Sequence, residues 1–322
     1  MSSSYKPLKT LFHMADGDGD VRVADELRRR WDSPTTHHWS YVVRDDRIFV
    51  LMTTALSRLI DRIWVNEVSI AGIWQSLPES VRSSYTTQLL VKEIRSTHEI
   101  EHIYLTGAEI MDALTAVHGL ARNGGEVGRS FIKMVRTYTE AFNADGALRY
   151  PQTVADIRQV YDMLLSHGLA DEDALDGQLF RAGSVSISNG MNTIHAGAVG
   201  EQNIIDRMQV MLDSSTDRQG TGLVNAMVEH FMLEHTHPFY DGNGRFGRFL
   251  LTMRLAQLLS KPTALSLSGH LLAHKTRYYK AFQDAEHPKN HAELTFFVQS
   301  MLSFLQSAQE ELLTHLNEQF ER

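Results

Sequence analysis

Two stretches with helical periodicity flank the segment His237-Pro238-Phe239-Tyr240-Asp241-Gly242-Asn243-Gly244-Arg245-Phe246-Gly247-Arg248. Before it, Val224, Val228 and Phe231 recur at steps of three and four residues, and the run from 249 to 259 is spaced in the same way. Such steps place apolar side chains on one face of a helix. The proline of the segment cannot continue a helix, and its glycines favour tight turns. The segment therefore predicts a helix, a tight loop and a second helix.

The same helical spacing recurs in other parts of the chain. It is found over residues 51–64, 154–164 and 296–313. One segment differs, because Val185 and Ile187 alternate with serines ahead of the two-residue turn Asn189-Gly190. Alternation followed by Asn-Gly is typical of a β-hairpin. The sequence therefore predicts an all-α fold with one small β-hairpin at residues 183–195.

The overall composition narrows the class of protein. The 322 residues include 31 Lys and Arg against 39 Asp and Glu, a formal net charge of -8, so bulk binding of nucleic acid is not expected. The absence of cysteine excludes disulfides, thiolate zinc sites and cysteine nucleophiles, and indicates a reducing compartment. With no signal-like amino terminus and no apolar run of about 20 residues, we expect a cytoplasmic protein without a membrane span.

The residues of the loop have the composition of a phosphate site. Gly242, Asn243 and Gly244 can turn successive backbone N–H groups inward to form a nest for anions. The helix that follows would add the positive end of its dipole. Arg245 and Arg248 are three residues apart, and each can bind phosphate oxygens in a bidentate manner.

Two further side chains of the segment can supply chemistry to a bound phosphate. Asp241 offers a carboxylate for magnesium, which is often held by one or two protein carboxylates together with the phosphates of the substrate. His237, at the end of the preceding helix, offers a base that titrates near neutral pH. The sequence predicts a nucleotide or phosphate site over residues 237–248.

Two alternatives to a phosphate site remain open at this level. His230, Glu234, His235 and His237 crowd one helix end and could ligate a transition metal, as in a metallohydrolase. The proline after His237 and the unused glycines and arginines count against that interpretation. The other alternative is a structural loop without chemistry.

The segment resembles the signature of the Fic family, His-Pro-Phe-x-Asp/Glu-Gly-Asn-Gly-Arg-x-x-Arg, and matches it at every specified position. A weaker similarity extends over residues 92–305. The resemblance implies a Fic-type helical bundle and transfer of AMP from ATP to a Ser, Thr or Tyr hydroxyl of a target protein, with release of pyrophosphate. Gly244, where the related Doc phosphotransferases have lysine, points to AMP transfer.

The resemblance also implies a role for each residue of the segment. His237 would deprotonate the acceptor hydroxyl, and Asp241 would hold Mg²⁺. The backbone at 242–244 would cradle the phosphates, with the side-chain amide of Asn243 bonded to one of them. Arg248 would bind the γ-phosphate and Arg245 would also serve the phosphates. The ring of Phe239 would anchor the loop in the core.

The hairpin at 183–195 would be the flap of such a protein. A flap aligns the target segment by adding it as a strand. Val185, Ile187, Asn189 and Gly190 would be its docking residues.

Many Fic proteins carry an inhibitory helix with the pattern Ser/Thr-x-x-x-Glu-Gly/Asn, and the segment near 94–102 is similar to it. Thr97 and Glu101 occupy the specified positions, whereas His102 replaces the usual Gly or Asn. Glu101 paired with Arg248 would remove the partner of the γ-phosphate and leave the nucleotide poorly placed for in-line attack. The enzyme would then be autoinhibited.

The chain divides into three predicted parts. Residues 1–91 form a helical amino-terminal extension, 92–260 the Fic region with inhibitory helix and flap, and 261–322 the helices that complete it. A homodimer and self-modification are further expectations. Two alternatives to AMP transfer are removal of AMP by the same site and a non-catalytic module that binds a nucleotide or a peptide.

Overall fold

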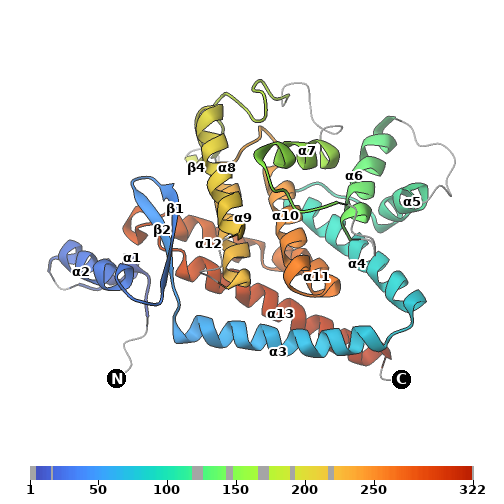
Figure 1. Cartoon of the computed structure of the whole chain (residues 1–322), viewed down its shortest axis with the longest axis horizontal. Helices are drawn as coiled ribbons and strands as arrows, with labels where there is room; N and C mark the ends of the chain where they lie inside the picture. Colours follow the sequence, from blue (N-terminus) through green and yellow to red (C-terminus); the bar gives the residue numbers. More distant parts are fainter. Residues whose placement is uncertain are drawn as a thin grey trace.

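The computed structural model describes residues 5–15, 17–117, 126–142, 148–165, 174–188, 193–216 and 221–320. Within these ranges helices dominate, and the strands form two antiparallel hairpins (Figure 1). This confirms the predicted helical fold class.

The amino-terminal part is not purely helical, in contrast to the expectation for residues 1–91. Its elements are α1 (Leu8–His13), α2 (Gly19–Trp31), β1 (Thr36–Val43) and β2 (Asp46–Leu51). Trp39, Tyr41 and Val43 are buried and alternate with less buried residues, which is the period of a strand. The turn is tight, because Val43 pairs with Asp46 and Arg44 has a φ of 57°.

Two long helices form the base of the molecule in Figure 1, where α3 and α13 run side by side. They are α3 (Thr54–Ser76) and α13 (Thr295–Phe320). The buried carboxylate of Glu67 on α3 accepts hydrogen bonds from Thr263 and from Gln309 of α13. Among the described residues, no helix is both long enough and apolar enough to cross a bilayer.

The middle of the chain contains the predicted hairpin between helices. The elements are α4 (Glu79–Ile100), α5 (Gly107–Val117), α6 (Glu126–Phe142), α7 (Val154–Leu164), β3 (Ser186–Ser188), β4 (Thr193–Ala196) and α8 (Glu201–Thr216). The backbones of Ile187 and His195 pair in antiparallel register, which confirms the hairpin. Its predicted turn, Asn189 and Gly190, lies outside the described residues.

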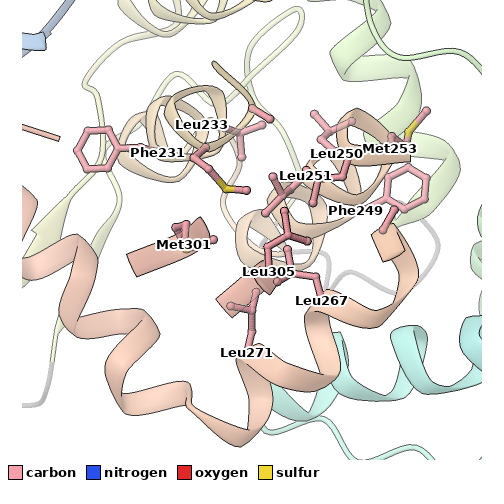
Figure 2. Packing of buried hydrophobic residues seen from close by; sticks show 14 of the residues in the cluster. Phe231, Leu233, Phe249, Leu250, Leu251, Met253, Leu267, Leu271, Met301 and Leu305 are labelled. Atoms are coloured by element: carbon pink, nitrogen blue, oxygen red, sulfur yellow. The ribbon is translucent and has the colours of Figure 1, made fainter. Parts of the chain in front are cut away.

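The core surrounds a pair of central helices. The remaining elements are α9 (Gly222–Thr236), α10 (Asn243–Leu258), α11 (Lys261–Ala273), α12 (Lys275–Ala285) and the short 3-10 helix η2 (Pro288–Asn290). Helix α9 is buried on nearly every side, as expected for a helix inside a core. In Figure 2, one group near the centre contains Leu233 of α9, Leu251 of α10, Leu267 of α11 and Leu305 of α13, and the ring of Phe231 lies to its left. This packing fixes both ends of the loop that joins α9 to α10.

Candidate active site

The loop between α9 and α10 is shaped by two left-handed residues. His237 caps α9 with φ 53° and ψ 62°, while its N–H still donates to the carbonyl of Leu233 at 2.9 Å. Gly242 precedes α10 with φ 77°, a conformation that glycine adopts without the steric cost of a side chain. The structure thus has the predicted helix, tight loop and helix.

Phe239 and Asn243 hold the loop from inside. The ring of Phe239 is buried and stacks on Tyr161 with a centroid separation of 3.5 Å. Asn243 Oδ1 accepts from the N–H of Phe239 at 2.9 Å, and Asn243 Nδ2 donates to the carbonyl of Phe239 at 2.8 Å. The amide thus braces the loop, and since Nδ2 has a second hydrogen, the expected bond from this side chain to a phosphate stays a prediction.

Helix α10 begins at the residues for which the sequence predicts an anion nest. The first N–H groups of a helix have no acceptor within the helix and carry the positive end of its dipole. Gly244 has no side chain to cover them, and a Cβ there would clash with the carboxylate of Glu101. The room that a phosphate oxygen would need beside Gly244 is taken in this structure by the carboxylate of Glu101.

Asp241 and Arg245 form an ion pair at the rim of the nest. The two side chains are 2.8 Å apart, and that of Asp241 is 50% exposed. Arg245 Nε is buried without a hydrogen-bond partner among the described residues. An accessible carboxylate beside a phosphate nest suits Mg²⁺, which prefers oxygen ligands, so the residues present fit this ion.

His237 is placed as a neutral base. The pKa of His237 is lowered to about 4, mainly because the ring is buried and to a smaller extent because His195 is nearby. Nδ1 faces the carbonyl of Glu234 at 3.4 Å, so Nδ1 carries the proton in the neutral ring and Nε2 carries the lone pair. The predicted base is thus in the protonation state that can accept a proton at neutral pH.

Arg181 holds His237 in place and was not anticipated from the sequence. Its side chain is fully buried, and Nε donates to the carbonyl of His237 at 2.8 Å. It also donates to the carbonyls of Thr236 and Gly183. One guanidinium therefore joins the end of α9 to the chain that leads into the hairpin. No local motif signals this residue, because its partners are backbone atoms distant in sequence.

The structure brings Thr97, Glu101 and Arg248 together. Arg248 is 1% exposed, and its Nη2 lies 2.7 Å from Oε1 of Glu101. Arg248 Nε donates to Thr97 Oγ1 at 2.9 Å, and Nη2 donates to the carbonyl of Thr97 at 2.9 Å. Burial raises the pKa of Glu101 and Arg248 lowers it, with a net lowering, so Glu101 is ionised at neutral pH. Nε and Nη2 of Arg248 are thus engaged by the end of α4.

The pattern that this segment resembles usually has glycine or asparagine at position 102, and the backbone conformation of His102 explains this preference. It has a φ of 61°, and the N–H of Ile103 reaches back to the carbonyl of His98 at 3.0 Å. This is the left-handed residue that ends a helix, a role for which glycine is favoured. Lys275 Nζ donates to His102 Nε2 at 2.9 Å, which ties the helix end to α12.

We expect His102→Gly to be more stable than His102→Ala by about 1 kcal/mol in free energy of unfolding. Both variants lose the bond from Lys275, but only alanine retains the steric cost of a left-handed backbone. Denaturant unfolding of the two variants measures the difference. Equal stabilities would mean that the strain at residue 102 is relieved in solution.

The residues of the metallohydrolase alternative do not form one site. His230 Nε2 is bonded to the hydroxyl of Tyr278 at 2.9 Å, and burial lowers the pKa of His230 to about 3. Burial raises the pKa of Glu234 to about 8, so this carboxyl is largely protonated at neutral pH. Among the described residues, the donor groups that converge are instead His195, His235 and Glu286.

Comparison with known proteins places the loop in a known family. Residues 151–255 match the sequence profile of the Fic/DOC family. Protein adenylyltransferase Fic of Aedes aegypti is 23% identical in an alignment 229 positions long that covers 64% of this chain and 41% of that protein. The chain thus matches about two fifths of the length of this curated relative.

Two solved structures share the fold. A Fic family protein from Desulfovibrio desulfuricans G20 is 24% identical with a TM-score of 0.62, covering 83% of this chain and 76% of that one. Fic-1 from C. elegans is 16% identical with a TM-score of 0.57, covering 96% of this chain and 80% of that one. Each similarity extends well beyond residues 151–255.

Proposed function

We propose that this chain, whose residues 151–255 are a Fic domain, transfers AMP from ATP to a hydroxyl group of a target protein. The observation that carries the proposal is the loop from His237 to Gly242. A neutral imidazole lies at one end of it and the amino-terminal end of α10 at the other. When a hydroxyl attacks a phosphate, a base must accept its proton and N–H donors must stabilise the phosphate charge. A base beside an anion nest can supply both.

In the proposed reaction, His237 Nε2 accepts the proton of the acceptor hydroxyl. The hydroxyl oxygen forms a bond to the α-phosphorus of ATP, and the bond from that phosphorus to the bridging oxygen of the β-phosphate breaks, so pyrophosphate leaves. The backbone N–H groups at 242–244 and the guanidinium groups of Arg245 and Arg248 stabilise the phosphate charge. Asp241 would hold Mg²⁺, which supplies charge neutralisation to the phosphates when bound.

Glu101 restrains this reaction in the proposed resting state. Its carboxylate forms an ion pair with Nη2 of Arg248 and lies against Gly244. Phosphate oxygens would otherwise bind at both places. The enzyme is thus self-inhibited until Glu101 withdraws. The position of Glu101 also favours a second candidate, removal of AMP from a target, because its side chain is 32% exposed and could orient a water molecule beside the nest.

The experiment that tests the proposal uses ATP labelled on either the α- or the γ-phosphate, incubated with Mg²⁺ and the Glu101→Gly protein. Label from the α-phosphate on protein, with a mass gain of one AMP, is the expected result. Label from the γ-phosphate would instead show phosphorylation and contradict the proposal. Release of AMP from a pre-labelled target by wild type, without transfer from ATP, would favour AMP removal.

We expect Asp241→Asn to reduce AMP transfer by about 100-fold, with the Mg²⁺ dependence of the rate shifted to higher concentration. The amide keeps the shape of the side chain but removes the negative charge that attracts the ion. Transfer rates over a Mg²⁺ titration measure this. Asp284→Asn is the matched control, because Asp284 is an exposed aspartate paired with Lys280 on α12. Equal Mg²⁺ dependence in wild type and Asp241→Asn would remove Asp241 from the metal site.

A further inference from the structure

A second group of polar side chains lies outside the loop motif. His195 on β4, His235 in the last turn of α9 and Glu286 directly after α12 have donor atoms within 4.8 Å of one another. His195 Nδ1 is 2.8 Å from Glu286 Oε2, and the rings of His195 and His235 are 5.2 Å apart. Three elements distant in sequence thus converge on one point.

The nitrogen of His195 that faces Glu286 is Nδ1, and the side chain is 10% exposed. In the neutral ring Nδ1 donates its proton to the carboxylate, and a cation shared by the two side chains would take the place of that proton. The proton would then lie on Nε2, which is buried and has no hydrogen-bond partner among the described residues. His195 and Glu286 can therefore ligate one ion through the atoms that contact each other in this structure.

Tyr41 orients the second imidazole. Its hydroxyl is 2.9 Å from His235 Nδ1, 2.7 Å from Thr236 Oγ1 and 3.1 Å from the carbonyl of Met232. Thr236 directs its own proton to the carbonyl of Met232. When Tyr41 donates its proton to the carbonyl of Met232, its oxygen accepts from Nδ1–H of His235. In that tautomer the lone pair of His235 is on Nε2. A hydrogen bond to the far nitrogen is the usual support of a metal-binding histidine.

The charge of the group suits a cation. Glu286 makes no ion pair with a lysine or arginine in the part of the chain that the structure describes, so its negative charge is shared only with His195. Arg207 and Arg44 are the two arginines that act on His235, and Arg207 donates to the carbonyl of Val42 and lies over the Tyr41 ring. Two imidazoles and a carboxylate are ligands that Zn²⁺ accepts and that Mg²⁺ does not select.

We propose that His195, His235 and Glu286 bind Zn²⁺, at a site separate from Asp241. Bonds of about 2.0–2.2 Å to each ligand require the donor atoms that lie farthest apart to approach by about 1 Å. His195 Nδ1 and Glu286 Oε2, 2.8 Å apart, would separate slightly. A water molecule would complete a four-coordinate shell. The ion would join β4 of the flap to the ends of α9 and α12, with His195 only 6.0 Å from the His237 ring, centroid to centroid. Zn²⁺ would thereby fix the flap next to the catalytic loop.

The test measures Zn²⁺ affinity directly, with the chelator-stripped full chain in competition against a chromophoric chelator and in excess Mg²⁺. We expect one Zn²⁺ per chain, and at least a 100-fold loss of affinity in His195→Ala and in Glu286→Gln. Tyr41→Phe, which removes only the support of His235, should lose about 10-fold. His291→Ala is the matched control, because His291 also pairs with a carboxylate, Asp46 at 3.1 Å, outside the group.

Binding of Co²⁺ gives a second readout that does not depend on activity. Four-coordinate Co²⁺ in wild type should show strong visible absorption, which Glu286→Gln should lose while its far-ultraviolet circular dichroism is unchanged. Failure of wild type to bind Zn²⁺ at one equivalent would overturn the proposal. So would equal affinity in wild type, His195→Ala and Glu286→Gln, since the ion would then lie elsewhere.

Discussion

Glu101→Gly is expected to raise the rate of AMP transfer by about 10- to 100-fold over wild type. The substitution removes the carboxylate that lies 2.7 Å from Nη2 of Arg248 and frees a buried guanidinium for the γ-phosphate. A misplacement of reacting groups by about 1 Å can cost about 100-fold in rate, so correct placement can restore a factor of this size. Incorporation of α-labelled AMP into the chain or a supplied target measures the change.

Two variants separate the loss of this ion pair from the effect of a glycine near a helix end. Glu99→Gly places glycine two residues earlier and removes only a longer contact with Arg95 of 3.7 Å, so it should leave the rate near that of wild type. Glu101→Gln keeps the size of the side chain without its charge and should give an intermediate rate. Equal rates in Glu99→Gly and Glu101→Gly would contradict the inhibitory role of Glu101.

His237→Ala is expected to abolish AMP transfer, with a loss of about 100- to 10,000-fold, the range typical of general base catalysis. The variant is best made together with Glu101→Gly, so that the starting rate is high enough to measure the loss. Arg181 holds the backbone carbonyl of residue 237, which alanine retains. The loop should therefore keep its shape, and ATP should still bind.

The measurement for His237 combines labelled AMP transfer with ATP affinity by calorimetry. His13→Ala is the control, because His13 is an exposed residue at the end of α1. A His237→Ala protein that binds ATP and transfers AMP at the starting rate would show that another group is the base. Loss of ATP binding together with activity would instead assign His237 to substrate binding.

The loop was predictable because its signals are local. The apolar periodicity on either side, the proline and the glycines all lie within a short stretch, and each restricts the backbone by itself. The pairing of Glu101 with Arg248 spans 147 residues. Only the resemblance of the segment near 94–102 to an inhibitory helix pointed to it, because no periodicity links two positions that far apart.

Other features were missed for identifiable reasons. The buried alternation of Trp39, Tyr41 and Val43 is present in the sequence, but it covers only a few residues and was not distinguished from the helical stretches around it. The residue type of Asn243 indicated a polar contact without its direction, and the structure turns the amide into the loop. Arg181 bonds to carbonyl groups, which every residue has, so sequence offers no partner to search for.

The contact of Arg248 with α4 has a consequence for how the molecule is divided. The family profile ends at residue 255 and begins at 151, so it contains His237 and Arg248 but neither Thr97 nor Tyr41. A polypeptide cut to those limits would expose the faces of α9 and α10 that pack on α11 and α13. It would keep each residue of the loop and lose the helices that pack against α9 and α10. The segment that matches the family profile is thus smaller than the set of helices that pack together around the loop.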